Sequence, residues 1–209
     1  MSTLVKRLPE KGMSSNSYLI ERGASRILID PSQPLPADWL KPTAIVCTHG
    51  HYDHLACLED LRSPTCPVII GRADASYLTD PNLNLGPLFG RKGQFQPADR
   101  LVTDGEIIDC GDQISLEWQE TPGHTPGSAC FLLRADGKIE AIFTGDTLFC
   151  DSIGRTDFPG GDSHQMLTSL VKLKRYLQEL PPDLPLYPGH GPTTTPAREL
   201  KHNMFLQQV

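Results

Sequence analysis

The chain has 209 residues, 38% of them hydrophobic, and a formal net charge of −6. A chain of this length is expected to form one domain, residues 1–209, with a large buried core. Its negative charge argues against a nucleic-acid partner, because contacts with phosphates need a basic surface. No stretch approaches the roughly 20 apolar residues that cross a bilayer. The N-terminus also lacks an apolar run of signal-peptide length, so we expect a cytoplasmic protein without a membrane partner.

Short apolar runs separated by turn residues predict the elements of the first half. Gly23 lies between two such runs, which is typical of a hairpin, and the unbroken run that starts at Ala44 is typical of a strand buried on both faces. Residues 84–97 contain three glycines and two prolines, which favour a loop. In chain order we expect strands over Tyr18–Glu21, Arg26–Asp30 and Ala44–Thr48, a helix over Asp53–Leu61, a strand over Pro67–Ile70, a helix over Asp74–Leu78 and a loop over Asn84–Pro97.

The second half repeats this order of strands followed by a helix. Asp136-Gly137 is a hairpin-turn dipeptide, Asp162 is suited to cap the longest helix, and Pro181-Pro182 ends that helix. We expect strands over Ile114–Glu120, Ala129–Leu133 and Ile139–Phe143, a helix over Ser163–Leu180, a strand over Leu184–Tyr187 and a helix over Pro196–Asn203. The pattern predicts sheets in the middle of the molecule and helices outside them.

Five of the seven histidines lie in short clusters that each follow a predicted strand. Loops at strand ends, held by a rigid scaffold, are common places for functional sites. Together with a cluster around Asp146, these segments are Thr48–His54, Pro122–Thr125, Thr144–Thr147 and Pro188–Gly191. The remaining two, His164 and His202, stand alone and are interpreted as ordinary polar residues.

The cluster His49, His51, Asp53 and His54 predicts a metal site. Three histidines and one carboxylate within six residues would carry a high desolvation cost if left unpaired. A divalent ion removes that cost, because it takes neutral imidazole and ionised carboxylate as ligands. Nitrogen-rich sites with a carboxylate suit zinc, and also iron or manganese.

The run His49-x-His51-x-Asp53-His54, followed by His124, Asp146 and His190, resembles the metallo-β-lactamase superfamily over nearly the whole chain. This resemblance implies an α/β fold, an αββα sandwich of two mixed β-sheets flanked by helices. It also implies two divalent ions at one edge of the sheets. By the resemblance, His49, His51 and His124 hold the first ion, Asp53, His54 and His190 hold the second, and Asp146 bridges them.

Four further segments resemble the glyoxalase II-like thioester hydrolases: Gly123–Ser128, Gly145–Phe149, Gly154–Phe158 and Pro188–Pro192. This resemblance implies that a metal-bridging hydroxide attacks an S-acylated thiol such as S-lactoylglutathione. Asp53 and Asp146 are then the catalytic carboxylates: both bind metal, and Asp53 also orients the nucleophile. A thiolate leaving group needs little protonation, so no separate general acid is expected.

A second reaction class stays open. Persulfide dioxygenases of the same fold share the Gly154–Phe158 stretch but use one iron, held by two histidines and one aspartate. Flavodiiron oxygen reductases carry Glu at the position of His51, nucleases of the superfamily carry a large inserted domain, and zinc β-lactamases are secreted. We therefore expect none of these three. The six cysteines form no CxxC pair and are expected to be reduced.

The substrate contacts are the least determined part of the site. The segment Asn84–Phe95 is either a lid, in which Phe89, Arg91 and Lys92 contact a small-molecule thioester, or an ordinary surface loop. Arg155 either faces an anionic end of the substrate or pairs with Asp157. Glyoxalase II enzymes continue into a helical region that binds the glutathione carboxylates, so we expect a high KM for S-lactoylglutathione here. The oligomer is expected to be a monomer or a homodimer.

Overall fold

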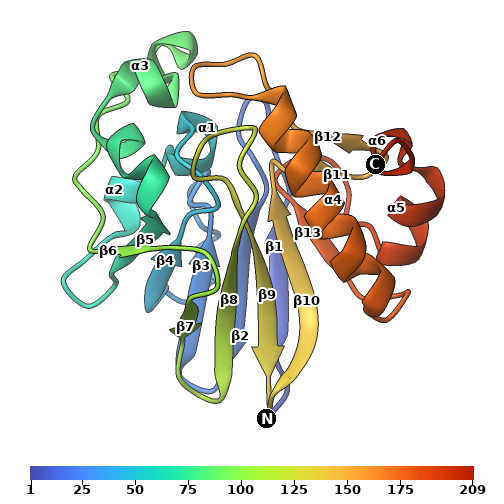
Figure 1. Ribbon diagram of the computed structural model, residues 1–209. Helices are drawn as coiled ribbons and strands as arrows, with labels where there is room; N and C mark the ends of the chain where they lie inside the picture. Colours follow the sequence, from blue (N-terminus) through green and yellow to red (C-terminus); the bar gives the residue numbers. More distant parts are fainter.

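The computed structural model describes residues 1–209 and has four layers, with helices outside two face-to-face sheets (Figure 1). The first sheet has six strands in chain order. These strands are β1 (Leu4–Leu8), β2 (Ser17–Arg22), β3 (Ser25–Ile29), β4 (Ala44–Val46), β5 (Val68–Gly71) and β6 (Arg100–Val102). Because β1 to β3 pair antiparallel and β3 to β6 pair parallel, this sheet is mixed.

The second sheet has five strands in the order β13-β10-β9-β8-β7. They are β7 (Ile107–Asp109), β8 (Ile114–Glu120), β9 (Ala129–Ala135), β10 (Lys138–Gly145) and β13 (Leu186–Pro188). The β10–β13 pair is parallel and the others are antiparallel, so this sheet is mixed too. A small hairpin of β11 (Leu148–Phe149) and β12 (Ser152–Ile153) follows β10.

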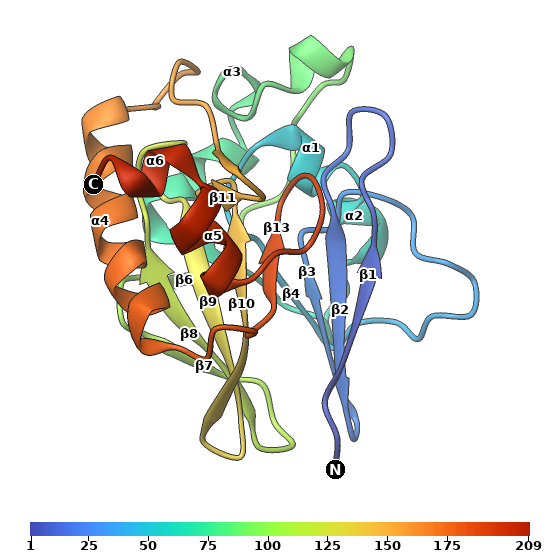
Figure 2. The same ribbon diagram turned by 90° about the vertical axis from the view of Figure 1, so that its right-hand side faces the viewer.

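Helices cover the outer faces of both sheets (Figure 2). Those of the first half are α1 (Tyr52–Leu55), α2 (Leu58–Leu61), the 3-10 helix η1 (Arg72–Leu78), α3 (Pro81–Asn84) and the 3-10 helix η2 (Gly86–Phe89). Those of the second half are α4 (Ser163–Glu179), α5 (Pro196–His202) and α6 (Met204–Gln207). None of them combines the length and the apolar character that a membrane-crossing helix needs.

Three apolar clusters hold the layers together. The largest, 17 buried residues, lies between the sheets and includes Trp118 and Phe131. A second packs the outer face of the first sheet against Leu55 and Leu58, and a third packs the second sheet against the Leu170 face of α4. Both sheets are therefore buried on both faces, which explains the unbroken apolar runs in the sequence. The predicted αββα sandwich of two mixed sheets is confirmed.

Several local predictions are confirmed. Asp136 and Gly137 both have positive φ, 49° and 76°, as a two-residue hairpin turn requires. The carboxylate of Asp162 accepts hydrogen bonds from the backbone N–H groups of His164 and Gln165, at 2.8 and 3.1 Å, and so caps α4. All six cysteines are free thiols.

The helix predicted over Asp53–Leu61 is wrong as one element, because the chain forms α1 and α2 with a break between them. The N–H of Cys57 donates to the carbonyl of Pro31 at 2.8 Å, which takes it out of the helical ladder. The helix expected over Asp74–Leu78 is a 3-10 helix, and η2 lies inside the expected loop. The strands β1, β6, β7, β11 and β12 and the helices α3 and α6 had not been predicted; each is at most 5 residues long.

Candidate metal centre

The four predicted clusters meet at one edge of the sandwich, close to α1 (Figure 1). Each arrives there at the end of a strand: Thr48–His54 follows β4, Pro122–Thr125 follows β8, Asp146 follows β10, and His190 follows β13. Strand ends are rigid because the sheet fixes their direction, so the sheets determine where the side chains converge.

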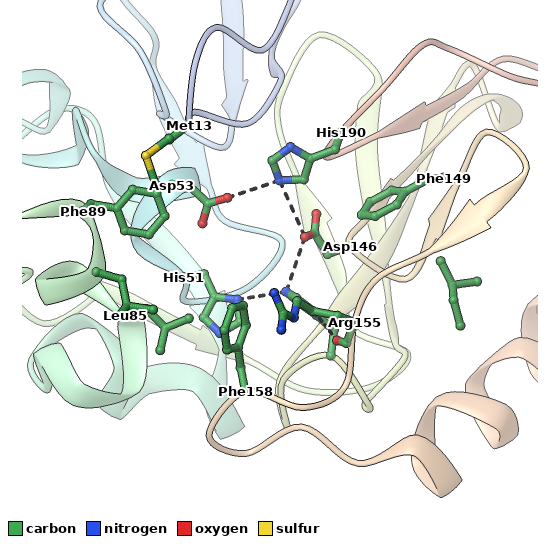
Figure 3. Close-up of a pocket in the computed structure, with 13 residues that line it drawn as sticks. Met13, His51, Asp53, Leu85, Phe89, Asp146, Phe149, Arg155, Phe158 and His190 are labelled. Carbon is green, nitrogen blue, oxygen red and sulfur yellow. Dashed lines mark hydrogen bonds and ion pairs between the residues drawn. The ribbon is translucent and has the colours of Figure 1, made fainter.

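All seven predicted ligands are present in three groups whose donor atoms lie within 4.8 Å of one another. The groups are His49, His51 and His124; His49, His54 and Asp146; and Asp53, His54 and His190. In the first, Nδ1 of His51 lies 2.8 Å from Nε2 of His124. In the third, Nε2 of His190 lies 3.2 Å from Oδ2 of Asp53, as Figure 3 shows. The first and third groups are the two ligand sets that the sequence implied.

Asp146 lies between these two groups. Its Oδ1 is 3.2 Å from Nε2 of His54, and its Oδ2 is 3.3 Å from Nε2 of His124. The same Oδ2 is 3.7 Å from Nε2 of His190. One carboxylate thus faces histidines of both groups, which is the arrangement that a bridging ligand requires.

Four buried atoms at this centre have no hydrogen-bond partner: Nε2 of His49, Nε2 of His51, Nε2 of His54 and Oδ1 of Asp146. A buried polar group left without a partner costs about 1–3 kcal/mol. Burial also lowers the pKa of His49 well below its usual range and that of His51 to about 3. Both imidazoles are therefore neutral, which is the form that binds metal. The residues fit divalent ions.

The second group has the opposite electrostatics. Burial lowers the pKa of His54, but the Asp146, Asp30 and Asp53 carboxylates more than offset this and raise it. The pKa of His190 is likewise raised to about 9 against the effect of burial, mainly by the hydrogen bond with Asp53. Without an ion, protons on these two histidines balance the carboxylates, and a bound cation would replace them.

The outward-facing Nδ1 atoms of three ligating histidines are each held by an acceptor. The pairs are His54 with Oδ2 of Asp30 at 2.8 Å, His124 with the carbonyl of Arg155 at 2.7 Å, and His190 with Oε2 of Glu10 at 2.7 Å. Such bonds fix the tautomer and turn Nε2 toward the centre.

Two buried carboxylates that the sequence did not mark support the ligand loops. Asp30 accepts hydrogen bonds from the N–H and hydroxyl of Thr48, at 2.7 and 2.8 Å, besides its contact with His54. Asp74 accepts from the N–H of Gly50 at 2.9 Å and from the hydroxyl of Thr125 at 2.7 Å, so it joins the two loops of the first group. A carboxylate at the end of the buried strand Arg26–Asp30 was a usable signal for the first. Asp74 is one of 25 acidic residues, and nothing in the sequence around it distinguished it from the others.

The Pro188–Gly191 loop is held by the N-terminal part of the chain. The side-chain amide of Asn16 donates to the carbonyls of Pro188 and Gly191 at 2.9 and 3.0 Å. Gly189 lets the loop approach the centre, because a Cβ there would lie 2.7 Å from Cε1 of His54 and would also meet Asp146.

A cavity of about 400 Å³ opens beside the ligands. Seven of its 13 lining residues are hydrophobic: Met13, Leu85, Leu88, Phe89, Phe149, Ile153 and Phe158. Of the predicted substrate contacts, Phe89 and Arg155 line this cavity (Figure 3). Arg91 and Lys92 are exposed and are not lining residues, so their contact with substrate finds no support in the structure.

The candidate lid is fixed at its base by Asn84. Its side-chain amide donates to the carbonyls of Tyr77 and Gly93, at 2.6 and 2.5 Å, and its oxygen accepts from the N–H of Gly86 at 2.9 Å. Gly86 and Gly93 pack closely around this side chain.

Sequence comparisons agree with this geometry. The family model described as the metallo-beta-lactamase superfamily matches residues 11–190. An uncharacterized protein of Mycobacterium tuberculosis strain H37Rv is 35% identical, with 98% of each chain covered. A Bacillus subtilis protein named "Probable metallo-hydrolase YqgX" is 33% identical, with 96% of each chain covered.

Three solved structures are similar over nearly the whole chain. The BLEG-1 B3 metallo-β-lactamase has a TM-score of 0.86 at 33% identity, with 97% of this chain and 99% of that one covered. TTHA1623, solved in a di-iron-bound form, has a TM-score of 0.79 at 31% identity, with 96% and 100% covered. ETHE1 from Myxococcus xanthus has a TM-score of 0.74 at 30% identity, with 96% and 83% covered.

Proposed function

The chain belongs to the metallo-β-lactamase superfamily, and on that premise we propose that it is a hydrolase that uses two divalent metal ions to cleave thioesters. The observation that carries the proposal is the convergence of all seven ligands, with Asp146 between the two groups. We propose zinc as the ion, with iron or manganese as alternatives. The similarity to a di-iron-bound structure makes iron the alternative to test first.

The chain's own residues supply position and electrostatics for this chemistry. When bound, divalent ions act as Lewis acids that polarise a carbonyl group and, in the case of zinc, lower the pKa of bound water to roughly 7. Asp146 holds both groups in one fixed relation, and Asp53 presents a carboxylate at the cavity surface, where it can orient a water molecule. Apolar side chains around them exclude other water.

The cavity contains no free general acid, and this suits a thioester substrate. The carboxylates that line it, Asp53 and Asp146, belong to the ligand groups, and Arg155 is bound to Asp157 through two contacts of 2.6 Å. An amide or an alkyl ester would need a proton donor for its leaving group. A thiolate leaves without one. This favours a glyoxalase II-like hydrolysis of S-acylated thiols such as S-lactoylglutathione.

The second candidate is a mononuclear iron persulfide dioxygenase. Its support is the group His49, His54 and Asp146, since two histidines and one carboxylate are the donor set of non-haem iron oxygenases. β-Lactam hydrolysis, set aside from the sequence, also returns as an activity to measure because of the similarity to a B3 enzyme.

Metal analysis and activity assays on one preparation test the proposal. We expect two ions per chain and hydrolysis of thioesters by the zinc-loaded protein, without oxygen uptake on glutathione persulfide. One iron per chain that added zinc cannot raise, together with oxygen uptake, would establish the dioxygenase instead. Turnover of a β-lactam but of no thioester would replace the proposed substrate.

A further inference from the structure

The cavity beside the metal centre has apolar walls on more than one side. Met13, Leu85 and Phe89 lie on one side of the ligands in Figure 3, and Phe149 lies on the other. Phe158 closes a further side. A substrate bound there meets hydrocarbon and aromatic surface in both directions from the reacting bond.

Aromatic rings approach both ligand groups directly. The ring centre of Phe158 is 5.8 Å from that of His51 in the first group, and the ring centre of Phe149 is 5.7 Å from that of His190 in the second. The apolar surface thus begins at the ligands themselves. Both the acyl side and the thiol side of a thioester would contact it.

The one arginine that lines the cavity is already neutralised. The Nε and Nη2 atoms of Arg155 donate to the two carboxylate oxygens of Asp157, each at 2.6 Å, and the guanidinium stacks on Phe158 with 4.0 Å to the ring centre. This two-pronged geometry occupies the Nε and Nη2 edge of the guanidinium and places a carboxylate charge against it. No lysine lines the cavity.

Such a cavity is poorly suited to a charged thiol carrier. Glutathione has two carboxylates, and placing a carboxylate against apolar walls without a partner carries a large desolvation cost. Methylene groups, in contrast, gain from the same walls, by about two- to fourfold in binding for each CH₂ buried.

We infer that the substrates are thioesters with uncharged, apolar groups on both sides of the carbonyl, and that Asp157 sets this preference by neutralising Arg155. The inference rests on the proposed thioester hydrolysis. The exposed side chains of Met13 and Leu88 mark the mouth of the cavity, so the preference extends to an apolar chain that reaches it.

Binding can be measured separately from catalysis with two thioethers that the protein cannot hydrolyse. S-octyl-N-acetylcysteamine is neutral and S-octylglutathione is charged, while both carry the same octyl chain. Titration calorimetry on the zinc-loaded protein is expected to show at least tenfold tighter binding of the neutral compound. Equal or tighter binding of S-octylglutathione would overturn the inference.

The variant Asp157→Asn tests the role of Arg155. Removing the carboxylate charge should tighten binding of S-octylglutathione by about three- to tenfold relative to the neutral thioether. The matched control is Asp136→Asn, which removes an exposed carboxylate that pairs with Arg22 at 2.8 and 2.7 Å, outside the cavity. The control should leave the ratio unchanged. If the two variants behave alike, Asp157 does not set the preference.

Kinetics on the zinc-loaded protein completes the test. For S-acyl-N-acetylcysteamines, kcat/KM is expected to rise from acetyl to octanoyl and to exceed the value for S-lactoylglutathione. Leu88→Ala should flatten the rise, whereas Leu167→Ala, an exposed leucine of α4, should not. Hydrolysis of no thioester, with the thioether preference intact, would refute the proposed function alone. Hydrolysis that is fastest for the glutathione thioester would refute the inference alone.

Discussion

The two ligand groups differ in how far they are shielded from water and in how charge is balanced around them. His49, His51 and His124 are at most 3% exposed, whereas the side chains of His190 and Asp53 are 29% and 17% exposed. In the first group burial lowers the pKa values of His49 and His51, while the second group combines raised histidine pKa values with carboxylates. One centre therefore contains a deep, preformed site and a shallower site that exchanges protons for metal.

This difference predicts an order of binding. In the first group His49 and His51 have no proton to release when an ion enters, whereas the second group must release protons, including that of the partly exposed His190. We expect the first group to hold its ion more tightly and the second to lose its ion first to a chelator. Substitutions and chelation test this order and measure the difference in affinity between the two groups.

The largest effect is expected from Asp146→Ala. Because Asp146 faces both groups, its loss removes a ligand from each ion and leaves two cations with less negative charge between them. Metal analysis after gel filtration should show fewer than one ion per chain, and thioester hydrolysis should fall by more than about a hundredfold. Retention of two tightly bound ions would show that Asp146 does not bridge.

The second largest effect, from His190→Ala, should distinguish the two ligand groups. His190→Ala removes a ligand of the second group only, so one ion per chain should remain and resist chelation as in the parent protein. His202→Ala, which changes an exposed histidine outside the ligand groups, serves as the control and should keep both ions. Loss of both ions from His190→Ala would mean that the first group cannot bind independently.

The pH dependence of metal binding should differ between the groups. The pKa of His190 is raised to about 9 by Asp53 and Asp146 against the effect of burial, so a proton competes with the second ion below that pH. Affinity of the second group should rise by up to about tenfold per pH unit until about pH 9. With the pKa of His51 at about 3 and that of His49 well below its usual range, proton release from these two ligands should add no pH dependence to the first group in this range.

The sign of the linked stability is opposite. In the metal-free protein a raised histidine pKa stabilises the fold below the unfolded value of about 6.5, and this contribution is lost as the pH rises through about 9. Chelator competition and thermal unfolding of the metal-free protein from about pH 6 to about pH 9 measure both effects. A first group that depends on pH as steeply as the second would remove the distinction.

The ligands could be predicted from the sequence, whereas of their two supporting carboxylates only Asp30 left a signal, its place at the end of a predicted strand. Metal ligands are few residue types at strand ends, and His49 to His54 concentrate four of them in six positions. Asp30 and Asp74 act through contacts that the tertiary fold creates, and Asp74 touches loops that are 24 and 51 residues away in the chain. Neither spacing has a local pattern.

The substrate contacts could also be predicted only in part from the sequence. Phe89 reaches the cavity, whereas Arg91 and Lys92, only two and three residues later, are exposed and do not line it. The chain turns between them, because Gly90 has a φ of 66° and ends η2. Composition suggested one lid with two cations, but the turn separates the apolar residues from the charged ones. The pairing of Arg155 with Asp157, one of two interpretations of the sequence, is present.

The smallest predicted effects come from the supports, and they should again separate the two groups. Asp74→Asn keeps the size of a side chain that accepts hydrogen bonds from the loops of the first group, but it turns one acceptor into a donor. Glu10→Gln makes the corresponding change next to His190 and keeps an oxygen that can accept from its Nδ1.

We expect Asp74→Asn to weaken binding of the first ion by about 10- to 100-fold. Glu10→Gln, in contact with a partly exposed histidine, should weaken the second ion by less than about tenfold. Competition with a zinc-binding dye measures both affinities on the same protein. If Asp74→Asn changed only the second affinity, the loops it joins would not form the first site, and the comparison of a deep and a shallow site would have to be reversed.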